Sequence, residues 1–251
     1  MKNAFILIYI LLGTCAIKGQ NQLDDQGRKT GPWKVEYPNG KTLYQGTFHE
    51  GRPVGLMTRY YNTGAVRAKM VFDRDRDRSH AKLYYKGGKI AAEGVYTGQD
   101  KDSVWTYYSE YDGSVRMREG FSNGKIHGKS LRYYPGGEVS EELNWEMNSK
   151  EGPWMQYFED GAIRLKSSYR NNLLNGAYDV YFADKIIMIS GSYADGKSEG
   201  LWSYHTDRGE LLYTLEYKDG KPLDQDKYNQ LMQDTLLKYD TIKTPEPFQL
   251  F

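Results

Sequence analysis

Residues 31–55 read GPWKVEYPNGKTLYQGTFHEGRPVG. Within residues 33–37 (WKVEY) bulky side chains alternate with charged ones, which is the period of two expected for a half-buried β-strand. Asn39-Gly40 is a dipeptide typical of a two-residue hairpin turn, where both central residues need a positive φ. The stretch therefore predicts a strand, a tight turn, a second strand and a second turn.

The same pattern recurs at a period of 24 residues along most of the chain. Counting from Gly31, the anchor position falls on Gly55, Ser79, Ser103, Gly128, Gly152, Gly176 and Gly200, with one extra residue before Gly128. A second aromatic position follows each anchor and holds Phe48, Phe72, Tyr96, Phe121, Trp145, Tyr169, Tyr193 and Tyr217. Self-similarity at a fixed period is the signature of a repeat protein. We predict an all-β fold: an open-ended array of about eight 24-residue β-hairpins, forming one elongated, twisted antiparallel sheet of about sixteen short strands.

The repeated motif resembles a known family. Gly-x-Trp-x-x-x-Tyr, then Asn-Gly or Asp-Gly, Gly-x-Phe or Ser-x-Tyr, and Asp-Gly-Lys-x-x-Gly look like the MORN-repeat variant. The clear copies are residues 31–55, 152–176 and 193–202, and the resemblance covers about residues 27–222. The chain is also similar to the bacterial YwqK-type toxin–antitoxin system antitoxin family. The third and fourth units depart most, with Ser79 and Ser103 at the anchor and Ala81 in place of Trp. The resemblance implies a hairpin array used for binding, and it implies no catalytic residue.

Composition and charge exclude several classes of protein. The chain has 251 residues, of which 39% are hydrophobic and 27% charged, so it is neither a disordered nor a multi-span membrane protein. Its 34 basic and 33 acidic side chains give a net charge of +1. A balanced chain has no global field with which to attract nucleic acid or an anionic membrane. The 27 glycines and 23 tyrosines follow from the repeat, because they mark its turns and its strands.

The first 19 residues are expected to be a secretory signal peptide. Lys2 precedes an apolar run from Ala4 to Ile17, which is too short to cross a bilayer, since crossing needs about 20 residues. An alternative is a lipobox over Leu12-Gly13-Thr14-Cys15 with Cys15 lipidated, which ranks second because Thr14 is a poor residue before the cleaved bond. The expected location is therefore outside the cytoplasm: periplasmic, at the cell surface or secreted.

Cleavage after Gly19 would change the chemistry of the mature chain. It removes Lys2 and Lys18, so 32 basic residues face 33 acidic ones and the net charge becomes −1. It also removes Cys15, so neither a disulfide nor a thiolate zinc site can hold the mature protein. Packing and backbone pairing alone must stabilise it.

The predicted organisation continues with a lead-in over residues 20–30, repeats over 31–222, a helix over 223–240 and an extended tail over 241–251. Asp224 or Asp226 can cap the helix, which we expect to cover the last hairpin, because repeat arrays generally need terminal caps. The rival interpretation is an amphipathic helix that binds a partner. The N-terminal sheet edge has no such cover, which makes self-association possible there. Alternating charges over residues 73–78 indicate a solvated loop, with a docking site for a charged partner as the alternative.

Motifs for chemistry are missing from the sequence. The four histidines occupy four different registers of the repeat, and no metal-binding, phosphate-binding or nucleophile motif occurs. Acidic residues stand at turn and outward positions. Two of them on adjacent strands could form a glycosidase-like pair about 5–9 Å apart, but the sequence does not single out any pair. We expect no enzyme activity, no metal and no cofactor.

The aromatic residues are the strongest candidates for function. The tryptophans at one repeat position are expected to form the core: Trp33, Trp105, Trp154 and Trp202. Doubled tyrosines follow in most units, and alternation along a strand sends one member of each pair away from that core. An exposed row of tyrosines would suit protein recognition. The candidate partner-binding residues are Tyr60, Tyr61, Tyr84, Tyr85, Tyr133, Tyr134 and Tyr157.

These observations predict a non-enzymatic, exported binding or scaffold protein, antitoxin-like by family resemblance, that engages a protein partner along an aromatic face. A cytosolic antitoxin role conflicts with the expected signal peptide. One alternative is an envelope-attached lipoprotein or a phospholipid-binding module, with membrane attachment only if Cys15 is lipidated. A second alternative is a cell-wall glycan hydrolase. No nucleic-acid partner is expected.

Overall fold

A computed structural model describes residues 19–73 and 77–230. The predicted signal peptide, the centre of the charged loop, the continuation of the C-terminal helix and the tail lie outside these residues. The described chain forms two compact units. Unit 1 runs to Asp77 and includes Lys86–Gly88, and unit 2 comprises Arg78–Tyr85 and the chain from Lys89 onward.

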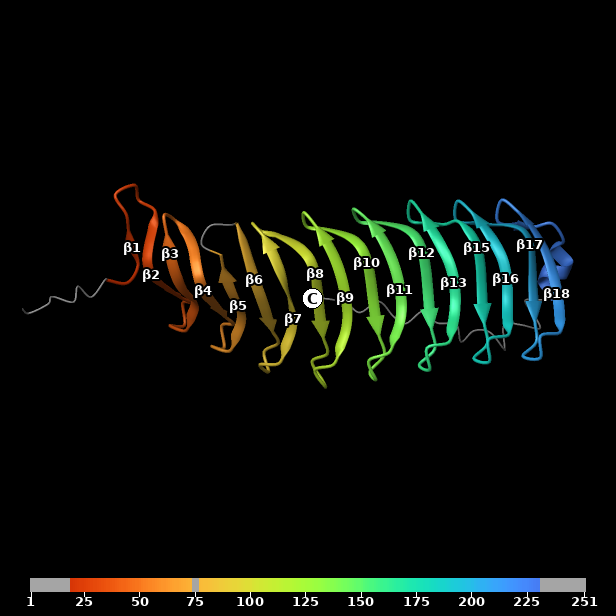
Figure 1. Ribbon diagram of the computed structural model, residues 1–251, viewed down its shortest axis with the longest axis horizontal. Helices are drawn as coiled ribbons and strands as arrows, with labels where there is room; N and C mark the ends of the chain where they lie inside the picture. Colours follow the sequence, from red (N-terminus) through yellow and green to blue (C-terminus); the bar gives the residue numbers. More distant parts are fainter. Residues whose placement is uncertain (1–18, 74–76, 231–251) are drawn as a thin grey trace, which may run out of the picture. The chain divides into compact units, whose positions relative to one another are not determined.

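Antiparallel strands make up both units (Figure 1). Unit 1 contains β1 (Gln22–Leu23), β2 (Lys29–Glu36), β3 (Thr42–His49), β4 (Arg52–Tyr60) and β5 (Val66–Phe72). The first seven strands of unit 2 are β6 (Arg78–Tyr84), β7 (Ile90–Thr97), β8 (Asp100–Tyr108), β9 (Val115–Ser122), β10 (Lys125–Tyr133), β11 (Val139–Glu146) and β12 (Ser149–Tyr157). The remaining seven are β13 (Ile163–Arg170), β14 (Leu173–Leu174), β15 (Gly176–Tyr181), β16 (Ile187–Ala194), β17 (Lys197–His205), β18 (Leu211–Lys218) and β19 (Lys221–Pro222).

The strand pattern confirms the predicted all-β fold of hairpin repeats. Nineteen strands are described, and without the two-residue strands β1, β14 and β19 sixteen remain, as the period predicts. Within each unit the strands pair antiparallel with their neighbours in chain order, except that β14 and β15 both pair with β13.

At Asn39-Gly40 the predicted two-residue turn is wrong, because only Gly40 (φ 75°) has a positive φ and the turn is closed further out, by the Tyr37 N–H donating to the Lys41 carbonyl at 2.7 Å. Gly40 itself donates its N–H to the Tyr37 carbonyl at 2.9 Å. At the second turn, Glu50-Gly51, both residues have a positive φ (48° and 80°).

A register shift marks the end of the first strand of every hairpin. It lies between Val35 and Glu36 in the first repeat and between Tyr107 and Tyr108 in the fourth. Such a bulge places one extra residue on one strand and increases the local twist. In pairs such as Tyr60-Tyr61 the first tyrosine ends the strand and the second begins the turn, whereas in the fourth repeat Tyr108 ends the strand and Ser109 begins the turn.

The tryptophans form the core of unit 2, as predicted. Trp105, Trp154 and Trp202 are 0%, 7% and 5% exposed, whereas Trp33 in unit 1 is only half-buried. The Trp202 ring lies flat against the backbone of the neighbouring strand, where a Cβ on Gly191 would come within 2.2 Å of a ring carbon. The Gly-x-Phe and Ser-x-Tyr parts of the motif thus supply small residues under the large ring.

A short element lies along one edge of each unit: β1 pairs with β2 and β19 pairs with β18. The expectation that the N-terminal edge is uncovered is therefore wrong. Residue Asn21 and strand β1 lie along β2: the Asn21 side chain donates to the Lys34 carbonyl at 2.9 Å and accepts from the Lys34 N–H at 2.7 Å. At the other end, a helix begins at residue 225, and the Asp224 carboxylate caps it by accepting from the Lys227 N–H at 2.9 Å. Asp224 is therefore the cap, and Asp226 lies within the first helical turn.

Candidate binding surface

The two faces of unit 2 carry different side chains. Trp105 on β8 lies opposite Glu119 on β9, and the next residue, Thr106, lies opposite Arg118. Because successive side chains point to opposite sides of a strand, these two rows define two faces. We name them the tryptophan face, which holds Trp105 and its equivalents, and the opposite face, which holds Thr106 and its equivalents.

The tyrosine that ends the first strand of a hairpin, which we call the strand-end tyrosine, belongs to the opposite face in unit 2; it is Tyr108 in the fourth repeat, Tyr133 in the fifth and Tyr157 in the sixth. The Tyr108 hydroxyl donates to Glu93, which is the strand neighbour of Thr106, and the Tyr157 hydroxyl lies 3.2 Å from Glu142. The guanidinium of Arg118 lies over the Tyr133 ring at 5.7 Å. Burial and the Glu93 hydrogen bond raise the pKa of Tyr108 to about 12, so its hydroxyl stays a donor at neutral pH. These rings are half-buried and held in place by charged neighbours.

The second tyrosine has a structural role. The hydroxyls of Tyr37, Tyr85 and Tyr134 each donate to the backbone carbonyl 23 residues later, at 2.7–2.8 Å. Each bond ties the turn of one hairpin to the strand end of the next. Tyr85 is 6% exposed, and its burial raises its pKa.

The predicted exposed row therefore differs from what the structure contains. Of the seven candidate tyrosines, Tyr85 is buried and the other six are half-buried. In unit 1, Tyr60 ends β4, and Tyr61 begins the turn with the guanidinium of Arg67 5.8 Å above its ring. In unit 2, Tyr84 and Tyr133 end β6 and β10. Among residues 19–73 and 77–230, Tyr111 is a strongly exposed aromatic, at 92% exposure, and it does not belong to a pair.

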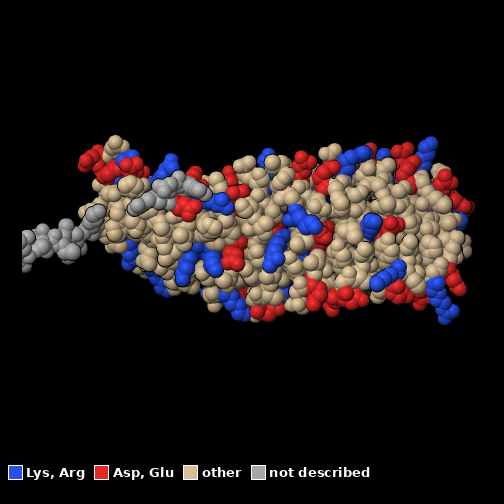
Figure 2. Space-filling view, in the orientation of Figure 1, with Lys and Arg blue, Asp and Glu red and all other residues tan. Residues whose placement is uncertain are grey.

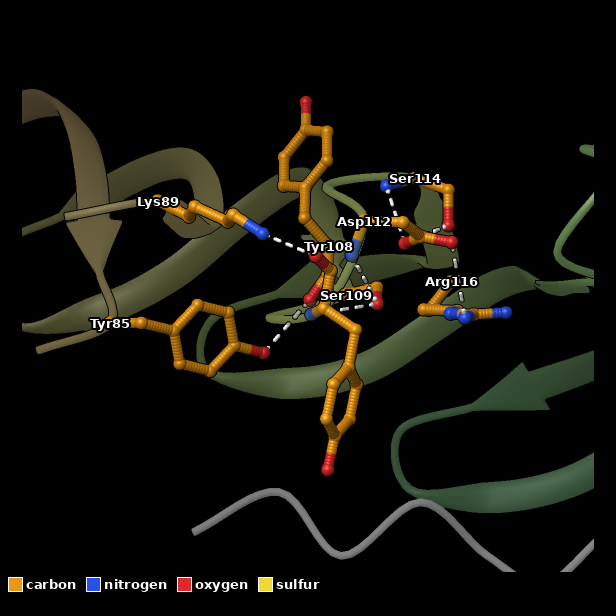
Figure 3. A network of polar contacts seen from close by, with 8 residues as sticks. Tyr85, Lys89, Tyr108, Ser109, Asp112, Ser114 and Arg116 are labelled. Carbon is orange, nitrogen blue, oxygen red and sulfur yellow. Dashed lines mark hydrogen bonds and ion pairs between the residues drawn. The ribbon is translucent and has the colours of Figure 1, made fainter. Parts of the chain in front are cut away.

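Tyr111 lies in the turn that contains the one-residue insertion of the repeat. Here Gly113 donates to the carbonyl four residues earlier, that of Ser109, at 3.0 Å. Asp112 accepts from the Ser114 N–H at 3.1 Å and hydroxyl at 2.8 Å, and Arg116 lies 3.7 Å away. Figure 3 shows this network beside Tyr85 and Lys89. Hydrogen bonds from Ser109 and Ser114, with the nearby Arg116 charge, hold the pKa of Asp112 well below its usual range.

Lysines on the tryptophan face lie inside boxes of aromatic rings. The Lys101 ammonium is 4.8 Å from the Trp105 ring, 5.0 Å from Tyr107 and 4.8 Å from Phe121, and it donates to the Tyr107 hydroxyl at 2.7 Å. Desolvation by burial lowers the pKa of Lys101, and the charge of Glu119 opposes that shift. Such cation–π contacts stabilise an ammonium that has lost part of its hydration.

A carboxylate accompanies this lysine on the same face. Glu119 is 9% exposed; burial raises its pKa, while the charges of Lys101 and Arg132 and a hydrogen bond with Tyr107 oppose the rise. Arg132 in turn lies 3.2 Å from Glu141, which accepts from the Trp154 indole at 2.9 Å. The sequence analysis placed the acidic residues at turns and outward positions, and this is wrong for Glu119 and Glu141. The sequence did contain a signal that Glu119 faces the core, because it stands at the repeat position that holds Gly46 or Leu215 in other repeats.

Charge elsewhere is mixed. On the face that Figure 2 shows, basic and acidic side chains of the described residues are interspersed, in line with the balanced composition. Within residues 19–73 and 77–230, no group of three or more His, Cys, Asp or Glu side chains could hold a metal ion. No helix in that part of the chain has the length and apolar character to span a membrane.

Comparison with known proteins supports the repeat type. A family model described as the MORN repeat variant matches residues 29–50, 126–147 and 150–171. These ranges are three hairpin repeats, and repeats of this kind generally mediate binding or scaffolding. No curated protein matches the chain.

Two solved structures that align with the chain have low sequence identity and low TM-scores. A TarM variant from S. aureus, in complex with fondaparinux, alpha-GlcNAc-glycerol and UDP, has 12% sequence identity and a TM-score of 0.20. The alignment covers 58% of this chain and 21% of that one. The Tc holotoxin pore of Photorhabdus luminescens has 10% identity and a TM-score of 0.23, covering 82% of this chain and 14% of that one. The chain thus spans a small part of the proteins to which it aligns.

Proposed function

We propose that this protein is an exported, non-enzymatic scaffold that binds a protein partner through the opposite face of unit 2. The observation that carries the proposal is the row of strand-end tyrosines on that face. Tyr108, Tyr133 and Tyr157 recur on every second strand, so neighbouring rings stand about 10 Å apart. Half-exposed tyrosines held by charged neighbours provide apolar contact area and hydrogen bonding together.

Apolar side chains extend the same face. Val104 precedes Trp105 on its strand and is 58% exposed, and Leu201 precedes Trp202 and is 63% exposed. Both stand one residue from a core tryptophan, so alternation places them on the opposite face beside the tyrosine row. A face on which aromatic and aliphatic side chains are regularly spaced between charged ones is suited to binding an extended surface of a partner protein. An antitoxin-like function would be one form of such binding, with a toxin as the partner.

The test compares partner capture by the tagged full chain and two variants in the native envelope fraction. We expect the double variant Tyr133→Ala/Tyr157→Ala to lose a specific partner by at least about tenfold, while its cooperative thermal unfolding persists. Tyr111→Ala is the matched control, because it removes a more exposed tyrosine that does not belong to the row. Equal loss in the control, or retention in the double variant, would overturn the proposal.

The export part of the proposal has its own measurement. Mass spectrometry of the protein from its native envelope should find a mature chain that begins at Gln20 or Asn21. A lipid-modified Cys15 at the N-terminus would support the lipoprotein alternative instead. A chain that retains Met1 in the cytoplasm would contradict export.

A further inference from the structure

A cavity of about 500 Å³ lies between two neighbouring tight turns of unit 2, those of residues 158–162 and 182–186. Figure 1 shows both turns at the lower edge of the sheet, one between β12 and β13 and the other between β15 and β16. Three of the lining residues are exposed, so the cavity is open to solvent. Its volume lies within the range of small-molecule sites, about 300–1,000 Å³. The lining residues are Asp160, Gly161, Ala162, Ile163, Tyr181 and Lys185.

Lys185 has a backbone conformation that every other repeat gives to a glycine. Its φ is 72°, and a Cβ is disfavoured in this left-handed region, so a glycine would suit the turn better. Strain of this kind is often found at functional sites. The turn itself therefore does not explain why a lysine stands here. The equivalent residues, all with a positive φ, are Gly40, Gly64, Gly88, Gly113, Gly137, Gly161 and Gly209.

The charged groups of the cavity have no charged partner within the described chain. The Lys185 ammonium makes no ion pair, hydrogen bond or ring contact with any residue that the structure describes. Asp160, on the facing turn, accepts from the Ala162 N–H at 2.9 Å and likewise forms no ion pair with a described residue. An acid and a base thus line one cavity without neutralising each other, and both remain available to a ligand.

Tyr181 adds a hydroxyl that is also available. It is the strand-end tyrosine of the seventh repeat. The equivalent hydroxyl of Tyr108 donates to Glu93, 15 residues earlier, whereas the residue 15 before Tyr181 is Lys166. Within the described part of the chain the Tyr181 hydroxyl makes no hydrogen bond. Burial, with the nearby Asp179 charge, raises the pKa of Tyr181, so its hydroxyl can donate as well as accept at neutral pH.

These groups together match the chemistry of a neutral saccharide. A sugar hydroxyl both donates and accepts hydrogen bonds, so it can meet a carboxylate, an ammonium and a phenol. One acid and one base leave the lining without net charge, which favours a neutral ligand over an anion or a cation. The side chains of Ala162 and Ile163 and the ring of Tyr181 offer apolar surface to the C–H groups of a sugar ring.

We propose that this cavity binds a neutral oligosaccharide. Asp160 accepts from sugar hydroxyls, Lys185 donates to them, and the Tyr181 hydroxyl can do both. The proposal goes beyond protein binding by the opposite face and does not depend on it, because its ligand is a glycan. Its test uses the purified full chain and defined sugars, so its outcome is separate from that of partner capture.

The experiment first exposes the tagged full chain to an array of immobilised neutral oligosaccharides. The sugars that bind are then titrated in solution by NMR, with the Gly161 and Lys185 amide resonances as reporters of this cavity. We expect saturable shifts of both resonances with at least one neutral oligosaccharide. Trigalacturonic acid, an acidic probe, should bind at least about tenfold more weakly.

Three outcomes would overturn the proposal. The first is that no neutral oligosaccharide shifts the two resonances. The second is that trigalacturonic acid binds as tightly as the neutral sugars or more tightly. The third is that an acetylated lysine–leucine–aspartate tripeptide saturates the shifts while the neutral sugars do not, which would assign the cavity to a peptide.

Variants of the lining residues provide a second readout. Lys185→Gly should lower the affinity for the neutral sugar by at least about tenfold and raise the melting temperature, because it also relieves the left-handed backbone. Arg208→Ala is the matched control, since it removes an exposed cation from the next tight turn and should leave the affinity unchanged. Tyr181→Phe should weaken binding severalfold, and Tyr111→Phe should not. Unchanged affinity in Lys185→Gly, or an equal loss in Arg208→Ala, would contradict the assignment.

Discussion

The tyrosine hydroxyls of unit 2 have two roles. The tyrosine at the end of a strand faces the proposed partner surface, and the tyrosine that begins the next turn bonds to the backbone of the neighbouring hairpin. The Tyr157 hydroxyl meets the carboxylate of Glu142, on the face that we propose for partner binding. The Tyr134 hydroxyl meets a backbone carbonyl of the next hairpin at 2.7 Å. A side chain that satisfies a carbonyl of the neighbouring repeat belongs to the fold, because a part-buried carbonyl without a donor is costly.

We therefore predict that Tyr134→Phe lowers the free energy of unfolding by about 1 kcal/mol, since it removes the donor and keeps the ring. Tyr133→Phe, one residue earlier, should change it by less than about 0.5 kcal/mol. Urea denaturation followed by circular dichroism measures both. Equal losses would show that the two tyrosines do not divide their roles in this way.

The buried charges around Lys101 give the second prediction at the residue scale. Lys101→Met should cost roughly 1–3 kcal/mol, below the value for a fully buried pair, because Arg132 still faces Glu119. Adding Glu119→Leu, the residue type at Leu215 in the last repeat, should recover most of that loss. A double-mutant cycle by denaturant unfolding tests this.

The pH dependence of the stability loss in Lys101→Met tests whether the charge of Glu119 causes that loss. Burial already raises the pKa of Glu119, and loss of the Lys101 charge raises it further. The deficit of Lys101→Met should therefore shrink as the pH falls, because a protonated Glu119 needs no countercharge. Additive losses in the cycle, or a deficit that grows on acidification, would contradict the coupling.

At the scale of elements, the hairpins could be predicted and the ends of their strands could not. Gly40 and the equivalent glycines specify these turns because few other residues tolerate the required positive φ. The alternation of side chains along a strand predicts which face of the sheet each residue occupies, but only where the strand has no register shift. The register shift before Tyr108 and the turn that begins at Ser109 break that alternation. For this reason the sequence suggested an exposed tyrosine in each pair, whereas the second member lies in a turn.

The lysine boxes also escaped prediction from sequence. Lys29 and Lys101 precede the anchors, and a lysine next to a turn is normally solvated. Only the packing of rings from two neighbouring strands shows that their ammonium groups are enclosed. The tryptophan core, by contrast, followed from periodicity because one register position has one environment in every repeat.

The inserted residue in the turn of β8 and β9 supports a prediction at this scale. Deletion of Tyr111 should restore the four-residue turn and the 24-residue spacing seen in the other repeats. Because the side chains of this turn are largely solvated, the free energy of unfolding should change by less than about 1 kcal/mol. Thermal and urea unfolding of the deletion variant measure the change. A loss of several kcal/mol would show that the Asp112 network stabilises the repeats on either side.

At the scale of the whole molecule, the tyrosines that build the repeats also determine the response to alkali. Burial raises the pKa of Tyr178 to about 12, and burial with the Glu93 hydrogen bond does the same for Tyr108. Burial also raises the pKa of Tyr107 and Tyr204. Unfolded tyrosines titrate near pH 10, so between about pH 10 and 12 the folded chain keeps protons that the unfolded chain loses.

The tyrosine contribution to stability is therefore complete below about pH 10 and lost as the pH rises toward about 12. Lys101 acts in the opposite sense, because its lowered pKa favours the folded state as its ammonium deprotonates, but it is one group against several tyrosines. We expect the melting temperature to fall steeply above about pH 10, with tyrosinate absorbance rising together with the loss of the β-sheet circular dichroism signal. Titration of all the tyrosines near pH 10 with an unchanged dichroism spectrum would contradict this, because it would mean that the ring hydroxyls are not buried by the fold.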